Sequence, residues 1–217
     1  MKILATEFSS ERRSVAVVAA GQVRARAEET GGRTARAFGL IEQALGEAKL
    51  DRAAIECLAV GLGPGSYTGI RLAISIAQGW QVARSVRLLG VSSVECLAAQ
   101  ARAEKLFGRV HILIDAQRHE FYLATYEIQP SDCRIVEPLR LATFDEVNAI
   151  AGRGEVLVSP DCLAGFPGSR IFWPAAAVLG QLASARSDFV TGDTLQPIYL
   201  REASFVKAPA PRALPAS

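Results

Sequence analysis

The feature that most constrains the fold of this chain is an order of strands and helices that its sequence predicts twice. Three strands come first, at Lys2–Phe8, Ser14–Ala20 and Val23–Glu29, and then a helix, a buried strand, a helix, a strand and a third helix. Short apolar runs rich in β-branched residues predict the strands, and apolar residues at helical spacing predict the helices. The order starts again at His111–Asp115 and Phe121–Glu127, in a shorter and more eroded form. The repeat predicts a duplicated α/β fold.

The remaining elements follow from the same patterns. The predicted helices are Ala35–Ala48, Tyr67–Arg84, Val94–Glu104, a short one ending at Ile150, and Ala175–Ala185. The further predicted strands are Ile55–Gly61, Val86–Val91, Arg134–Leu141 and Glu155–Ser159. Ser92 with Glu95, and Thr143 with Glu146, have capping-box spacing, in which two side chains satisfy free N–H groups at a helix start.

The repeat and the composition together predict the domain organisation. We expect an N-terminal domain at 1–106 and a smaller C-terminal domain at 107–207. Within the latter, Asp193–Glu202 is expected to be an extended segment laid against the body of the protein. The Ala/Pro-rich residues 208–217 are expected to form a disordered tail.

Composition excludes several classes of protein. The chain has 217 residues, is 50% hydrophobic and has a net charge of +2, so it can bury a core and has no strongly basic surface. His111 and His119 are its two histidines, which disfavours the common zinc motifs. The scattered cysteines are expected to be buried thiols of a reducing compartment, and they are Cys57, Cys96, Cys133 and Cys162. No apolar run approaches the ~20 residues of a membrane span. We therefore expect a cytoplasmic protein without membrane association.

One glycine-rich stretch is distinctive. It runs from Gly61 to Arg71 and links a predicted strand to a predicted helix. Its candidate site residues are Gly63, Gly65, Ser66, Thr68 and Gly69. Ser66 or Thr68 can cap the helix, and free N–H groups at a helix start favour an anion. The stretch therefore predicts either a phosphate-contacting loop or a tight structural turn.

Other residues allow catalytic interpretations, which we weigh against structural ones. Glu7 and Asp115 each end a strand and can form a carboxylate pair for catalysis or metal binding, but no further acid or histidine accompanies them. We favour local backbone hydrogen bonds for both. Ser66 lies in a strand–turn–helix layout like that of hydrolase nucleophiles, but Gly-x-Ser-x-Gly is not met. We therefore expect no catalytic residue and no metal site.

Several separated blocks resemble one family. Residues 63–71, Gly-Pro-Gly-Ser-Tyr-Thr-Gly-Ile-Arg, resemble the signature of the bacterial TsaB (YeaZ) proteins, in which Phe usually replaces Tyr67. Residues 91–95, 115–118 and 197–201 resemble further family stretches in the same order along the chain. The family is related to the TsaD, or M22 glycoprotease-like, superfamily.

The resemblance implies a fold and a function. The implied fold is the two-domain actin-like (ASKHA, ribonuclease-H-related) fold. The implied role is that of a non-catalytic partner subunit in forming N6-threonylcarbamoyladenosine at position 37 of tRNAs that read ANN codons. The implied partners are a TsaD-type transferase, a TsaE-type ATPase and, when the chain is alone, a second copy of itself. The resemblance also implies that the chain contacts tRNA only indirectly, through the complex. No cofactor is implied for the chain itself, although a nucleotide at the interface of the complex is compatible with the family.

The sequence also departs from the family pattern. The first strand usually ends Ile-Asp-Thr-Ser-Thr, whereas residues 6–10 are Thr-Glu-Phe-Ser-Ser. In actin-like ATPases this place holds an aspartate that serves the metal-bound nucleotide, so Glu7 disfavours such a role. The alternatives that remain open are a stand-alone actin-like kinase or ATPase and, less favoured, an M22-type peptidase.

The helix Tyr67–Arg84 predicts a docking face. It is apolar apart from a stripe of Arg71, Ser75 and Gln78, so it needs cover on more than one side. We expect a helical interface made with Ala35–Ala48 and used for both the homodimer and the TsaD-type partner. The expected interface residues are Gly69, Ala73, Ile76, Ala77, Trp80, Phe38 and Ile41.

Overall fold

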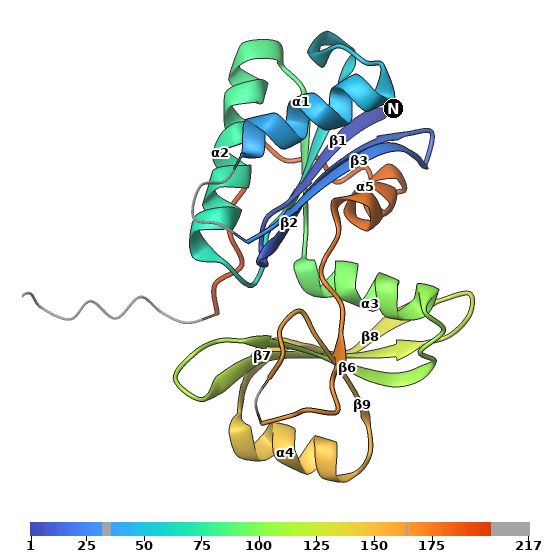
Figure 1. The fold of residues 1–217 in the computed structure, drawn as a ribbon, viewed down its shortest axis with the longest axis vertical. Helices are drawn as coiled ribbons and strands as arrows, with labels where there is room; N and C mark the ends of the chain where they lie inside the picture. Colours follow the sequence, from blue (N-terminus) through green and yellow to red (C-terminus); the bar gives the residue numbers. More distant parts are fainter. Residues whose placement is uncertain (32–35, 164, 201–217) are drawn as a thin grey trace, which may run out of the picture.

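In the part of the chain that the structure describes, the N-terminal half builds the first of two five-stranded sheets (Figure 1). The computed structural model describes residues 1–31, 36–163 and 165–200. The strand order is β3-β2-β1-β4-β5, and the strands are β1 (Lys2–Glu7), β2 (Arg12–Ala19), β3 (Gln22–Thr30), β4 (Cys57–Gly61) and β5 (Arg87–Val91). The first three strands are antiparallel, while β4 pairs in parallel with β1 and with β5.

The second sheet repeats this topology. Its order is β10-β9-β6-β7-β8, and its strands are β6 (Gly108–Asp115), β7 (Glu120–Ile128), β8 (Cys133–Thr143), β9 (Val156–Ser159) and β10 (Arg170–Ile171). Again three antiparallel strands are followed by two that pair in parallel. The equivalence confirms the predicted duplicated, two-domain actin-like fold. The second copy is eroded, because the described residues between β9 and β10 form no counterpart of the long helix that follows β4.

Helices cover one face of the first sheet. The helices α1 (Ala37–Ala48) and α2 (Tyr67–Arg84) pack on that face, where Ile41 and Ala73 join Leu4, Val17 and Leu58 in one apolar cluster. The helix α4 (Phe144–Gly152) similarly covers one face of the second sheet. A short 3-10 turn, η1 (Arg52–Ala54), precedes β4.

Two helices each pack on the sheet of the other half of the chain. The helix α3 (Ser93–Ala103) follows the first sheet in sequence but packs on the second, where Leu97 meets Ile112. The helix α5 (Ala176–Ser184) follows the second sheet but covers the first, where Leu179 meets Ile3 and Ala5 (Figure 1). The division expected between 106 and 107 separates the two sheets but not these helices. Apolar spacing shows which helix face is buried and not which sheet buries it.

One of the two expected capping boxes is present in the structure and the other is not. At the start of α4, the Thr143 hydroxyl accepts from the Glu146 N–H at 3.3 Å and the Glu146 carboxylate accepts from the Thr143 N–H at 2.7 Å, which confirms that box. The expected box at Ser92 is wrong. The Ser92 hydroxyl donates instead to the Gly63 carbonyl at 3.3 Å, and Glu95 pairs with Arg186 at 3.3 Å. Ser92 and Glu95 therefore bind residues that are distant in the sequence instead of each other's backbone N–H groups.

The C-terminal segment returns to the first sheet. The N–H of Val190 donates to the Leu88 carbonyl at 2.9 Å, and the N–H of Ile198 donates to the Leu62 carbonyl at 2.9 Å. The predicted extended segment is thus confirmed as far as residue 200, and the predicted tail at 208–217 lies outside the described residues. Among the cysteines, Cys57 and Cys96 are buried as expected, whereas Cys133 is half-buried and Cys162 is exposed.

Candidate functional site

The glycine-rich turn packs directly against the end of β1. Gly65 has a φ of +147°, and a Cβ at this position would lie 2.1 Å from the Ser9 carbonyl oxygen. A Cβ at Gly69 would lie 1.9 Å from the Phe8 carbonyl oxygen. The N–H of Ser66 donates to the Ser9 carbonyl at 2.7 Å. The glycines therefore let two backbone segments touch where any side chain would separate them.

The other residues of the turn connect it to its neighbours. Gly63 has a φ of +82°, and its carbonyl accepts from the N–H of Ser93 at 2.9 Å. Ser66 is the N-cap of α2, since its hydroxyl accepts from the Gly69 N–H at 3.3 Å. Thr68 does not cap the helix and is exposed. The turn thus joins β1, α2 and α3.

A large cleft opens beside this turn. Its volume is about 1290 Å³, and it lies between the residues after β1, the first turn of α2, the end of β6 with the turn that follows, and residues 160–161. Gly65, Ser66 and Thr68 line it, and Tyr67 and Tyr199 contribute aromatic rings. The carboxyl ends of parallel strands in both sheets meet here, which is the usual position of ligand sites in open α/β sheets.

The ionisable groups of the cleft are mostly acidic. Glu11, Asp115 and Asp161 line it, with Arg13 as a basic neighbour. Partial burial, together with the charges of Glu11 and Asp115, raises the pKa of Asp161. The Asp115 carboxylate accepts from the Gln117 N–H at 2.7 Å, which is the local backbone bond expected for it. Across the described ranges, no three His, Cys, Asp or Glu side chains are grouped as metal ligands.

Glu7 is not a wall of the cleft. Its carboxyl group is fully buried and accepts two hydrogen bonds, from the Ser9 N–H at 2.8 Å and from the Ser93 hydroxyl at 3.0 Å. Burial raises the pKa of Glu7, although both hydrogen bonds oppose the shift. The buried carboxyl group therefore links the end of β1 to the start of α3 through a hydrogen bond.

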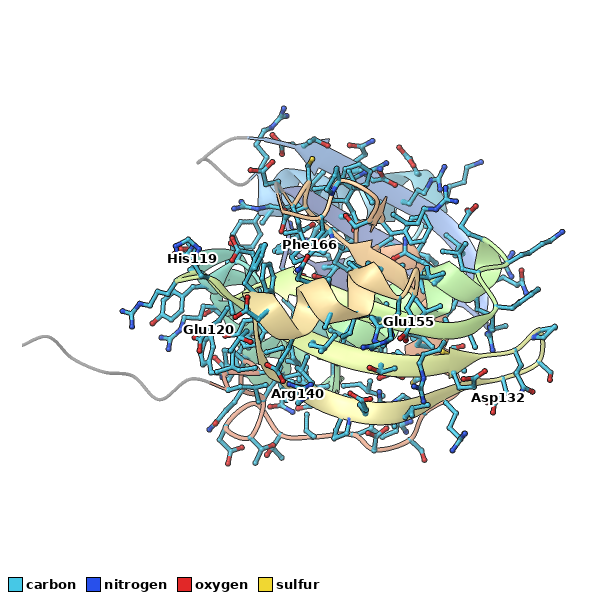
Figure 2. All side chains as sticks on the ribbon, turned by 90° about the horizontal axis from the view of Figure 1, so that it is seen from below. His119, Glu120, Asp132, Arg140, Glu155 and Phe166 are labelled. Atoms are coloured by element: carbon cyan, nitrogen blue, oxygen red, sulfur yellow. The ribbon has the colours of Figure 1, made fainter. Side chains whose placement is uncertain are left out.

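Neither histidine supports a hydrolase. His111 lies between Thr125, whose hydroxyl is 3.0 Å from Nδ1, and Glu155, whose carboxylate is 2.7 Å from Nε2. This is the order of a catalytic triad, but Thr125 is completely buried and no substrate can reach it. His119 lies in the exposed turn between β6 and β7 (Figure 2). The triad geometry is therefore a structural network.

The expected interface residues lie at different depths. Gly69, Ala73, Ile76, Ala77 and Ile41 are buried within the chain, Trp80 is half-buried, and Phe38 is 63% exposed. Along α2 the residues left open to solvent include Thr68, Ser75, Gly79 and Val82. Successive members are seven, four and three positions apart, so they share one helix face. A partner at these helices would meet this face and Phe38, with the buried residues supporting it from beneath.

The C-terminal segment of the chain itself covers part of α2. The Gln78 amide donates to the Gly192 carbonyl at 2.7 Å, and the Gln81 amide oxygen accepts from the Gly192 N–H at 2.8 Å. The rings of Tyr67 and Tyr199 stack 5.7 Å apart, and the Arg71 guanidinium lies 4.3 Å from the Tyr67 ring centroid. The Arg71 Nε–H also donates to the Tyr199 hydroxyl at 3.4 Å, so Arg71 and Gln78 of the polar stripe both hold the C-terminal segment. Polar residues on an otherwise apolar helix were the available signal.

Comparisons with known proteins found a family model and several relatives that resemble this chain. Residues 34–160 match the family model described as TsaD, tRNA N6-adenosine threonylcarbamoyltransferase. The chain is 35% identical over 128 residues to the tRNA threonylcarbamoyladenosine biosynthesis protein TsaB of Escherichia coli, a match over 58% of this chain and 55% of that protein. A Bacillus subtilis protein of the same name is 29% identical over 92 residues, 42% of this chain and 39% of that protein. The matches thus span about half the length, or less, of these curated relatives.

A solved structure covers more of the chain. YeaZ from Pseudomonas aeruginosa superposes with a TM-score of 0.77 at 28% sequence identity, over 92% of this chain and 99% of that one. Across the described residues, no helix is both long enough and apolar enough to cross a bilayer.

Proposed function

Because this chain belongs to the TsaD family, we propose that it is a partner subunit in forming N6-threonylcarbamoyladenosine at position 37 of ANN-decoding tRNAs. In this role it supports a TsaD-type transferase and does not carry out the transfer. The family match and the likeness to proteins named TsaB and YeaZ support this assignment.

The observation that carries the non-catalytic role is the burial and hydrogen bonding of the Glu7 carboxyl group. In an actin-like ATPase the end of the first strand presents a carboxylate to the metal of a bound nucleotide. Here the carboxyl group is buried and both its oxygens accept hydrogen bonds from Ser9 and Ser93. The geometry therefore supports a chain that keeps the fold of an ATPase but uses this position to hold its own elements together.

The partner would dock on the exposed face of α1 and α2. Phe38 is a large apolar side chain in solvent, and Val82 is 88% exposed at the far end of α2. On the same face of α2 as Val82, the exposed Ser75 and Gly79 are small, which permits close approach of another helix. We assign this face to the TsaD-type subunit and, in its absence, to a second copy of the chain.

The other members of the complex follow from the same assignment. A TsaE-type ATPase completes it, any nucleotide is held at the interface of the complex, and tRNA is bound through the partner. The site of action is the cytoplasm.

Depletion of the chain tests the proposal. Nucleosides from the tRNA of depleted cells are measured by mass spectrometry, and we expect N6-threonylcarbamoyladenosine to fall while other modified nucleosides are unchanged. Restoring the chain should restore the modification. A Ser66→Ala variant should restore it as well as the wild type, since Ser66 is here a helix cap and not a nucleophile. Unchanged modification after complete depletion would reject the proposed function.

A further inference from the structure

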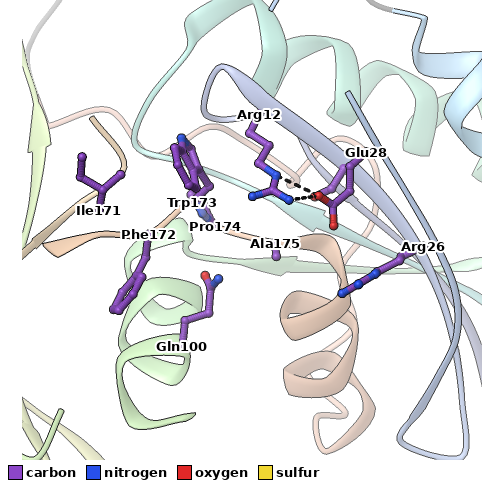
Figure 3. A pocket seen from close by; sticks show the side chains of 10 residues that line it. Arg12, Arg26, Glu28, Gln100, Ile171, Phe172, Trp173, Pro174 and Ala175 are labelled. Atoms are coloured by element: carbon purple, nitrogen blue, oxygen red, sulfur yellow. Dashed lines mark hydrogen bonds and ion pairs between the residues drawn. The ribbon is translucent and has the colours of Figure 1, made fainter. Parts of the chain in front are cut away.

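A second, smaller pocket lies on the other side of the β2–β3 hairpin from the cleft and shares no lining residue with it. Its volume is about 290 Å³, and its walls come from β2 and β3, from α3 and from the segment that leads into α5 (Figure 3). Small-molecule sites usually occupy roughly 300–1,000 Å³, so this pocket fits a small metabolite and not a nucleotide.

Of the two arginines that line this pocket, Arg12 has side-chain partners among the described residues and Arg26 does not. The Arg12 Nε–H donates to the Glu28 carboxylate at 2.8 Å, and the Arg12 guanidinium lies 5.4 Å from the centroid of the Trp173 ring. Arg26 also lines the pocket and, within the part of the chain that the structure describes, its guanidinium forms no hydrogen bond or ion pair. Two arginines and one glutamate give the lining a net charge of +1. The pocket therefore favours an anion, with Arg26 as the available donor.

The amide of Gln100 adds a second unsatisfied group. Its side chain rises from α3 into the pocket (Figure 3), and its Oε1 atom is buried without a hydrogen-bond partner among the described residues. A buried acceptor without a donor is costly. The terminal torsion of glutamine is broad, so a small rotation turns this oxygen toward an occupant of the pocket. An occupant with a hydroxyl or amino group would supply the missing donor.

We propose that this pocket binds a small carboxylate that also carries a hydroxyl or amino group. The carboxylate pairs with the Arg26 guanidinium, and the hydroxyl or amino group donates to Gln100. The carbon skeleton lies against the apolar wall formed by Phe172, Trp173 and Pro174. The site is independent of the proposed tRNA-modification role, because none of these residues belongs to the cleft or to the exposed face of α1 and α2.

Trp173 provides the signal for a binding experiment. In a Trp80→Phe variant of the full chain Trp173 is the remaining tryptophan, and its fluorescence is followed during titration with L-lactate, L-serine, propionate and methyl lactate. We expect a saturable change with lactate or serine, weaker binding of propionate, which lacks the donor, and no binding of methyl lactate, which lacks the charge. Titration calorimetry on the unmodified chain gives the same comparison without relying on the Trp80 replacement.

Two arginine variants decide the role of the pocket. Arg26→Ala should weaken binding by about tenfold or more, as expected for loss of a charge-assisted hydrogen bond. Arg24→Ala is the matched control, because Arg24 is exposed two residues earlier on β3 and does not line the pocket. Its affinity should stay within about twofold of the parent. The proposal is overturned if neither lactate nor serine binds saturably at millimolar concentration, if methyl lactate binds as well as lactate, or if the two arginine variants behave alike.

Discussion

The Ser93 hydroxyl donates a hydrogen bond of 3.0 Å to the buried carboxyl group of Glu7, joining the end of β1 to the start of α3. The two residues are 86 positions apart in the sequence. A Cβ on Gly61 would lie 2.0 Å from the Glu7 Oε2 atom, so the neighbouring strand leaves room for this carboxyl group only by lacking a side chain. Since α3 packs on the second sheet, the bond links the two halves of the fold.

Glu7→Gln should stabilise the protein at neutral pH. The pKa of Glu7 is raised in the folded state, so the folded protein holds this proton at pH values at which the unfolded chain has released it. The contribution of Glu7 to stability is therefore fully present below about 4.5 and is lost as the pH rises toward the folded pKa. Glutamine can accept from Ser9 and donate to Ser93 without a charge.

Chemical denaturation across pH 4 to 8 measures this effect. We expect the free energy of unfolding of Glu7→Gln to exceed that of the wild type by about 1 kcal/mol at pH 7 and to differ little near pH 4. Ser93→Ala, which removes a donor but keeps the carboxyl group, should be less stable than the wild type. Parallel pH profiles for Glu7→Gln and the wild type would show that this carboxyl group does not titrate differently in the two states.

Gly65→Val should destabilise the fold without any ligand being involved. The positive φ and the approach of Ser9 leave no room for a side chain, so we expect a loss on the order of 1–3 kcal/mol. Gly46→Ala is the control, because that helical glycine has no neighbour within 4 Å and an alanine there should stabilise by roughly 0.5–1 kcal/mol. Thermal unfolding measures both. A Gly65→Val variant as stable as the wild type, but impaired in binding nucleotide or phosphate, would make the turn a ligand site.

Val82→Arg should weaken the two proposed assemblies, the homodimer and the complex with a TsaD-type subunit. The side chain is 88% exposed, so the monomer should fold normally while the partner surface gains an uncompensated charge. Sedimentation and pull-down measure the two assemblies. Ile135→Arg on β8 is the control, since it adds the same charge at an exposed apolar position of the second domain. Equal assembly by both variants would place the interface elsewhere. Gln78 is unsuitable for this test because it already binds Gly192.

Gln78→Ala should loosen the C-terminal segment from α2. Loss of the bond to Gly192 should raise hydrogen exchange at the Val190 and Ile198 amides, which donate to Leu88 and Leu62. Ser75→Ala, one turn away on the same helix, should leave this exchange unchanged. Equal protection in Gln78→Ala and the wild type would show that the stacking of Tyr67 with Tyr199 holds the segment without Gln78.

Local chemistry determined much of this protein. Apolar periodicity placed the strands and helices, the spacing of Thr143 and Glu146 defined the start of α4, and the glycines from 61 to 69 marked the turn that lets α2 touch β1. These features depend on residues near one another in the sequence, where backbone preference and side-chain alternation act directly. The repeated order of strands and helices is readable for the same reason, whereas the directions of the strands and the short strand β10 were not predicted.

Only the tertiary structure decided which surfaces meet. Nothing local distinguishes the sheet that covers α3 from the one that covers α5, because both helices present an apolar face that either sheet can bury. The same holds for Ser92, whose hydroxyl bonds to Gly63 and not to its own helix, for the polar stripe of α2 that holds Gly192, and for the burial of Glu7 beneath Ser93. These partners lie far apart in the sequence, and a contact of that kind is selected by the packing of the whole chain.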